Sequence, residues 1–279
     1  MNTYRYAKAR ALIISGAVLL VFLLVPAMFT AFFSSAATVF IRSDLTVLSD
    51  LLLTAAGYLL ALFLIVKRYR KSKKPLNEIL GLFPHRFAQW RTLGFLTSGF
   101  ALGTAVSAAL SLLPKQLTES YNAGMRIDYH GAELFVWLAT VLVIAPLSEE
   151  IIFRRFVLGA LQEAFSVRVS VIVSAAVFAI LHVQLLWIFY AFAMGLLLGR
   201  VAADAGDLTM SASMHVGFNT SILPMVLLPA QTSAYRFLFG NRWMIAGYLA
   251  VGTAGGGFLL WKLLGEKKAD SILSGEAAG

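Results

Sequence analysis

The sequence contains no cysteine and few charged residues. None of its 279 residues is Cys, and only 13% are Asp, Glu, Lys or Arg. The lack of cysteine excludes disulfides, iron–sulfur clusters, thiolate zinc sites and a cysteine nucleophile. Because a soluble domain has about a quarter of its residues charged, the low charge content argues against a soluble protein.

Apolar residues are correspondingly abundant. They make up 59% of the chain, and the mean hydropathy is +0.79. They form long continuous runs rather than alternating patterns, which excludes a β-barrel and indicates membrane-spanning helices. We therefore predict an all-α, polytopic membrane protein with about eight transmembrane helices, at about 11–33, 45–66, 92–113, 134–153, 169–187, 188–204, 208–230 and 243–264.

Two of these expected segments need comment. The run 11–33 is longer than the apolar core of a signal peptide, which is about 7–15 residues, so we expect it to be the first spanning helix. Residues 156–168 are too short and too polar to span, and we expect an amphipathic or re-entrant element there. The glycine pairs Gly195/Gly199 and Gly252/Gly256 have GxxxG spacing and predict close helix packing.

The basic residues predict the orientation in the membrane. With the N-terminus inside, 18 of the 23 Lys and Arg residues fall in inner segments, including KRYRKSKKP at 67–75. The positive-inside rule then places both termini in the cytoplasm. This clustering beside apolar runs accounts for the net charge of +9 without nucleic acid, and it fits a bacterial plasma membrane.

We expect three regions along the chain. Residues 1–90 form N-terminal transmembrane helices with a basic cytoplasmic linker. Residues 91–265 form the membrane-embedded core, with its motifs at about 130–225. Residues 266–279 form a short cytoplasmic tail.

An acidic pair lies near the end of the expected fourth helix, in PLSEEIIFRR at 146–155. Neighbouring residues on a helix point about 100° apart, so Glu149 and Glu150 cannot face the same spot. Arg154 lies one turn after Glu150, which predicts an ion pair and leaves Glu149 directed into the bundle. Pro146 should bend the helix near Glu149. Alternatively, these charges simply mark a helix end.

Polar side chains also interrupt two later apolar runs. His182 follows Phe178 by four residues, and Asn219 follows His215 by four, so each pair shares a helix face. A charged group at the centre of a membrane helix costs ~3 kcal/mol, so such residues are rarely passive. Alone, His182 could be a packing histidine, and His215 with Asn219 an interhelical hydrogen-bonding pair. With the acidic pair, they form the set that a buried hydrolytic site needs.

The order of these motifs resembles the CPBP family of intramembrane proteases. The strings EEIIFR, FAILH and HVGFN at 149–154, 178–182 and 215–219 match E-E-x-x-x-R, F-x-x-x-H and H-x-x-x-N. The family includes type II CAAX prenyl endopeptidases and bacterial Abi or bacteriocin-immunity relatives. The resemblance covers roughly 130–225, and no motif position is missing.

The resemblance implies a role for each motif residue. Glu149 corresponds to the base that activates water, and Glu150 to a supporting carboxylate, with Arg154 as the motif arginine. His182 corresponds to the histidine that acts on the water with the glutamate. His215 and Asn219 correspond to the pair that binds the oxyanion or, if the family's mechanism is interpreted as metal-dependent, partly the metal.

The expected function is hydrolysis of a peptide bond in a membrane-associated, CAAX-like peptide or protein substrate within the lipid bilayer. Zinc held by His182, His215 and a carboxylate, Glu149 included, is one mechanism. Metal-free activation of water by Glu149 and His182 is the other. The alternatives are a non-catalytic scaffold or immunity-type binding protein, and a transporter that uses the buried polar groups as an ion path.

Overall fold

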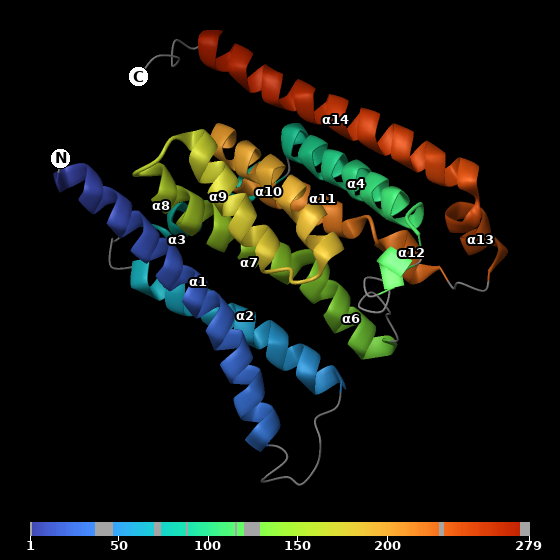
Figure 1. Ribbon diagram of the computed structural model, residues 1–279, viewed down its shortest axis with the longest axis horizontal. Coiled ribbons are helices and arrows are strands. Elements are labelled where there is room, and N and C mark those ends of the chain that lie inside the picture. The colour runs from blue at the N-terminus through green and yellow to red at the C-terminus, as the bar shows by residue number, and fades with distance from the viewer. Residues whose placement is uncertain are drawn as a thin grey trace. The chain divides into compact units, whose positions relative to one another are not determined.

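The computed structural model describes residues 2–36, 47–69, 74–87, 89–114, 116–119, 129–228 and 232–273. These residues form helices and turns, with no strand among them, which confirms the predicted all-α class. They divide into two compact units (Figure 1). Unit 1 holds Met1–Leu82 and Asp128–Ser174, and unit 2 holds Phe83–Ile127 and Ala175–Gly279. The predicted boundaries at residues 90 and 265 separate regions of different expected function, and they stay a prediction.

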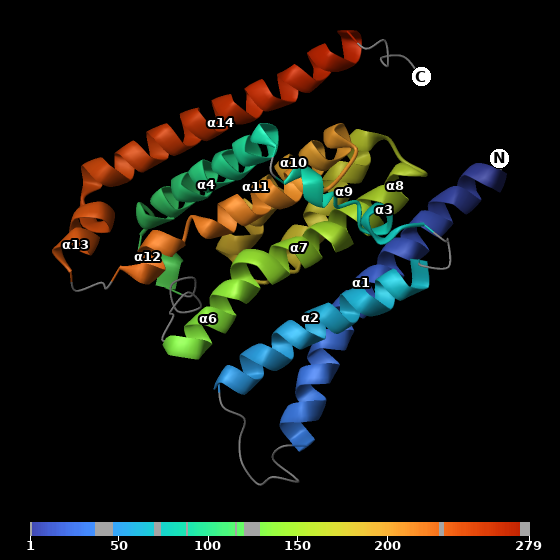
Figure 2. The same cartoon turned by 180° about the vertical axis from the view of Figure 1, so that it is seen from behind.

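Unit 1 contains two long N-terminal helices and a long helical stretch that carries the acidic motif. Its elements are α1 (Asn2–Ala36), α2 (Val47–Tyr69), α3 (Leu76–Leu80), α6 (Gly131–Ala139), η4 (Thr140–Ile144), α7 (Ala145–Glu150), η5 (Ile151–Leu158), α8 (Gly159–Gln162) and the first half of α9 (Val167–Ile180). Both views show α1 crossing α2 (Figure 2), and the two helices pack together. A Cβ on Gly57 would lie 2.8 Å from the Pro26 Cα, so the helices meet closely at Pro26, which lies inside α1. Helix α1 also packs on η5 and α8, and α2 on α6, η4 and α7.

The acidic motif lies within an uninterrupted helical stretch from Gly131 to Gln162. The predicted end near 153, followed by a separate amphipathic element at 156–168, is therefore wrong. Phe156, Val157 and Leu161 are buried, because α1 packs along η5 and α8. That packing lets the helix continue through a sequence that looks too polar to span.

Unit 2 is a helical bundle around α4. Its elements are η3 (Pro84–Arg86), α4 (Trp90–Ser111), the second half of α9, α10 (Leu185–Ala205), α11 (Thr209–Thr220), α12 (Leu223–Leu227), α13 (Ser233–Gly240) and α14 (Arg242–Leu273). Helix α4 packs on both α11 and α14, which lie beside it in both views (Figures 1 and 2). Gly252 and Gly256 bring α14 against α4, and the Ser98 hydroxyl donates to the Gly256 carbonyl at 2.8 Å, so this GxxxG pair serves helix packing as predicted.

Six helices in the described part of the chain are long and apolar enough to span a membrane, against about eight predicted. The predicted spans 169–187 and 208–230 are instead the shorter helices α9 and α11. The break between the fifth and sixth segments lies at 181–184, earlier than predicted. Helix α14 also continues into the predicted tail as far as Leu273, and 274–279 lie outside the described residues. The polytopic helical class itself is confirmed.

Candidate active site

The predicted site residues divide between the two units. Glu149, Glu150 and Arg154 belong to unit 1, whereas Phe178, His182, His215 and Asn219 belong to unit 2. The geometry of each group follows separately.

The two glutamates lie on α7, a short α-helical segment between two π-helical segments. The Ala145 N–H donates to the Thr140 carbonyl five residues back, and the following Pro146 has no N–H to donate. The predicted irregularity at Pro146 is thus a widened helical turn. The second π-helical segment, η5, begins directly after Glu150. Such segments are rare and frequently lie at functional sites, because they change the direction of side chains on an otherwise regular helix.

The two glutamates have different surroundings. The Glu150 carboxylate lies 3.5 Å from the Arg154 Nε, and both side chains are 0% exposed, which confirms the predicted ion pair. Glu149 is partly exposed and interacts electrostatically with Tyr58 of α2. Glu150 is therefore enclosed with its cation, while Glu149 remains accessible.

Arg155, the second arginine of the motif, holds another part of unit 1. Its guanidinium donates to the Glu78 carbonyl at 2.7 Å and to the Ile79 carbonyl at 3.0 Å. These carbonyls belong to α3, so Arg155 fixes this short helix against η5. No role for Arg155 was predicted from the sequence, in which only its position beside Arg154 sets it apart. Tyr58 was also missed, since a tyrosine in an apolar helix carries no distinct signal.

In unit 2, His182 lies just beyond the end of α9 rather than within a helix. Its Nδ1 is 2.8 Å from the Phe178 carbonyl oxygen. A carbonyl only accepts hydrogen bonds, so this contact places the proton on Nδ1. The lone pair on Nε2 is then available to accept a hydrogen bond or to bind a metal.

A tight turn directs the chain away after His182. The Gln184 N–H donates to the His182 carbonyl at 2.6 Å, and Val183 between them has φ 62°. A hydrogen bond from i+2 to i with positive φ at the centre describes a γ-turn, which is strained for a β-branched residue. Strained backbone of this kind is concentrated at functional sites.

Phe178 contacts both imidazoles. Its ring centroid is 4.7 Å from that of His182 and 5.9 Å from that of His215, both in edge-type arrangements. Phe178 therefore positions His182 through its carbonyl and both histidines through its ring. His215 is buried, and Asn219 one turn later is partly exposed on the same face of α11.

Helix α11 is held on its other side by backbone contact with α4. A Cβ on Gly217 would lie 2.0 Å from the Leu96 carbonyl oxygen, and one on Gly99 would lie 1.9 Å from the Met214 carbonyl oxygen. Because Gly217 is two residues from His215 and from Asn219, it points about 160° away from each of them. His215 and Asn219 therefore point away from α4.

Polar contacts fix the start of α11. Buried Asp207 pairs with Arg86 and accepts a hydrogen bond from the Thr209 N–H at 2.8 Å. The Thr209 hydroxyl in turn accepts from the Phe83 N–H at 3.2 Å. This network was not predicted, because the pairs Arg86 with Asp207 and Phe83 with Thr209 are more than 100 residues apart in the sequence.

Within neither unit do the described residues contain a group of three or more His, Asp or Glu side chains that could hold a metal ion. The donors in unit 2 are two imidazoles on one phenylalanine ring, with the Nε2 of His182 free to coordinate. Imidazole nitrogens are common zinc ligands, so the two donors of unit 2 fit part of a zinc site.

Comparison with known proteins supports the resemblance seen in the motifs. Residues 131–221 match the family model described as type II CAAX prenyl endopeptidase Rce1-like. YdiL of Bacillus subtilis (strain 168), described as a candidate membrane peptidase, is 28% identical over 142 residues, which are 51% of this chain and 57% of YdiL. The match thus spans little more than half of that relative. No solved structure matches the chain. The family match contains every predicted site residue from Glu149 to Asn219, so the resemblance to CPBP-family proteases is confirmed.

Proposed function

Because residues 131–221 resemble CPBP-family proteases, we propose that the chain is an intramembrane endopeptidase acting on a membrane-associated, CAAX-like peptide or protein. The observation that carries the proposal is the 2.8 Å contact between the His182 Nδ1 and the Phe178 carbonyl oxygen. The Nδ1–H is held by this carbonyl, which leaves Nε2 as a base or ligand. The description of the matching family model, type II CAAX prenyl endopeptidase Rce1-like, supports the substrate class. We place the protein in a bacterial plasma membrane with both termini in the cytoplasm.

In the proposed reaction, Glu149 accepts a proton from water while His182 Nε2 orients that water. The water oxygen attacks the scissile carbonyl carbon, and His215 and Asn219 donate hydrogen bonds to the resulting oxyanion. When the carbon–nitrogen bond breaks, Glu149 returns its proton to the leaving amine. Glu150 and Arg154 take no part in proton transfer and hold the helix that carries Glu149.

Zinc forms the second element of the proposal, and with the ion bound His182 Nε2 would hold zinc instead of orienting the water. His182, His215 and Glu149 would hold the ion, since two imidazoles and a carboxylate are a common catalytic zinc set. Zinc bound there would polarise the water and the scissile carbonyl. The roles of Asn219, Arg154 and Phe178 are the same with or without it.

Cleavage assays on the purified chain test the activity. Wild type should cleave a prenylated CAAX peptide or another membrane-associated peptide in lipid nanodiscs, and Glu149→Gln should lose ~10²–10⁴ of the rate. Glu133→Gln, a substitution of the same type in the first turn of α6, serves as the matched control and should retain activity. Equal cleavage by wild type and Glu149→Gln would remove Glu149 as the base. Absence of cleavage across both substrate classes would favour the scaffold alternative.

Metal analysis tests the zinc element separately. Wild type should carry about one zinc per chain, and His182→Ala and His215→Ala should each lose it. Full activity after complete removal of metal by a chelator would reject zinc and leave the metal-free mechanism.

A further inference from the structure

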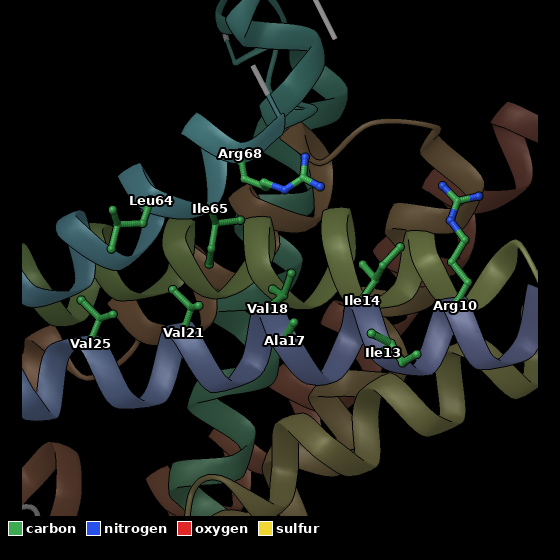
Figure 3. A pocket seen from close by; sticks show the side chains of 10 residues that line it. All are labelled: Arg10, Ile13, Ile14, Ala17, Val18, Val21, Val25, Leu64, Ile65 and Arg68. Carbon is green, nitrogen blue, oxygen red and sulfur yellow. The ribbon is translucent and has the colours of Figure 1, made fainter. Parts of the chain in front are cut away.

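Unit 1 contains a groove between α1 and α2 with a volume of about 530 Å³ (Figure 3). Apolar side chains line most of its length, including Ile14, Ala17, Val21 and Val25 of α1 and Leu64 of α2. The α1 residues recur at helical spacing and form one continuous stripe. From Arg10 to Val25 this stripe extends ~22 Å at ~1.5 Å per residue, which exceeds half of a ~30 Å hydrocarbon core.

The two polar side chains that line the groove lie in the half away from Val25. Arg10 is near the start of α1 and Arg68 is near the end of α2, and Figure 3 shows both guanidiniums on the groove side of α1. Both side chains are exposed. Arg10 also lies 3.6 Å from the Glu163 carboxylate, but both members of this pair are more than half exposed, so the pair holds Arg10 only weakly.

A phospholipid has matching chemistry along its length. Guanidinium groups bind phosphate oxygens in a bidentate manner, and basic residues at a membrane surface attract anionic lipids. An acyl chain attached to that phosphate would continue along the apolar stripe. A soluble phosphate compound would leave the apolar part of the groove unused, and a zwitterionic lipid would bring its own cation to the two arginines.

We propose that the α1–α2 groove is a binding site for an anionic phospholipid, with the phosphate between Arg10 and Arg68 and one acyl chain along the stripe from Ile14 to Val25. This site is separate from the proposed hydrolytic residues and does not depend on the proposed function. Because α1 also packs on η5 and α8, bound lipid would stabilise the helical stretch that carries the acidic motif.

Lipid binding to the purified full-length chain tests the charged end of the site. Native mass spectrometry and thermal unfolding in a neutral detergent should show phosphatidylglycerol binding to wild type and raising its Tm, with a much smaller effect from phosphatidylcholine. Arg68→Gln should weaken phosphatidylglycerol binding about tenfold or more, since it loses a charge-assisted hydrogen bond. Lys67→Gln removes the same charge from the neighbouring position, whose ammonium lies over the Phe63 ring outside the groove, and should bind as wild type does.

A second pair of variants tests the apolar part and does not depend on the folding of Arg68→Gln. Ala17→Phe fills the groove at an exposed position, whereas Leu20→Phe adds an aromatic ring to an exposed site of α1 outside it. The first should lose phosphatidylglycerol binding and the second should keep it. Inorganic phosphate at matched concentration should not raise the Tm of wild type. Equal binding by Arg68→Gln and Lys67→Gln, or by Ala17→Phe and Leu20→Phe, would overturn the proposal and indicate unspecific lipid contact.

Discussion

At the scale of single residues, the hydrogen bond between His182 Nδ1 and the Phe178 carbonyl decides what the imidazole can do. Asparagine can present an amide N–H near the position of Nδ1 but has no group at the position of Nε2. His182→Asn should therefore preserve the turn and the Tm while the rate of peptide cleavage falls ~10²–10⁴-fold. Cleavage and thermal unfolding measured on the same preparation check this expectation. His182→Asn with wild-type activity would mean that Nε2 has no role.

Glu150 and Arg154 are expected to act through stability. Removing one member of a buried ion pair leaves the other charge uncompensated, which typically costs about 3–5 kcal/mol. Glu150→Gln should therefore lower the midpoint of denaturation strongly. The double variant Glu150→Gln/Arg154→Met should recover part of the loss, because no charge is left buried. Denaturation of the two variants and of Arg154→Met completes the cycle, and additive losses would contradict the coupling.

Some of these residue-level features could be predicted from spacing alone. The interval of four between Glu150 and Arg154 was enough, because both lie in one helical stretch. The same interval between Phe178 and His182 predicted that the two residues lie close together, but not which of their atoms make the contact. His182 lies past the helix end and bonds to the Phe178 backbone, which depends on the turn at Val183.

At the scale of elements, the position of α11 depends on its backbone contact with α4. A methyl group on Gly217 would overlap the Leu96 carbonyl, and backbone cannot move aside as a flexible side chain can. Gly217→Ala should therefore lower stability by about 1–3 kcal/mol or more and reduce activity, because α11 carries His215 and Asn219. In α14, a Cβ on Gly247 would meet nothing within 4 Å, so Gly247→Ala should raise helix stability by ~1 kcal/mol. Thermal unfolding of both variants checks the opposite signs, and a neutral Gly217→Ala would contradict the packing argument.

The lengths of α9 and α11 could not be predicted from hydropathy. The chain turns at Val183, within the apolar run from 169 to 199. No Gly or Pro marks this break, and valine ordinarily favours strands. Helix α11 ends at Thr220, and after a turn the chain forms α12 from Leu223, with Pro224 in its first turn. The first break thus carries no turn residue that would mark it in the sequence, whereas Pro224 marks the second, and hydropathy alone records neither.

At the scale of the whole molecule, the basic residues predict the orientation. Reporter fusions after Lys71 and Lys267 should indicate cytoplasm, and a fusion within 118–128 should indicate the opposite side. Lys71 and residues 120–128 lie outside the described residues, so the fusions add information that the structure does not contain. A fusion after Lys71 on the outer side would overturn the predicted orientation.

The predicted convergence of the site residues can be tested with pairs of introduced cysteines, because the chain contains none of its own. Catalytic groups that share one water are separated by at most two hydrogen bonds of about 3 Å each. Glu149→Cys combined with His182→Cys, and Glu149→Cys combined with His215→Cys, should therefore be joined by a thiol reagent that spans ~8 Å.

The pair Glu149→Cys/Phe258→Cys provides the control, since Phe258 is exposed on α14 and belongs to no motif. It should give little crosslinking under the same conditions. Crosslinking can be followed in native membranes by the shift in electrophoretic mobility of a chain cut once by a protease between the two positions. If neither histidine position is joined to position 149, the hydrolytic assignment fails. The motif residues would then be explained by the scaffold alternative, in which each polar group is satisfied within its own unit, as Glu150 is by Arg154.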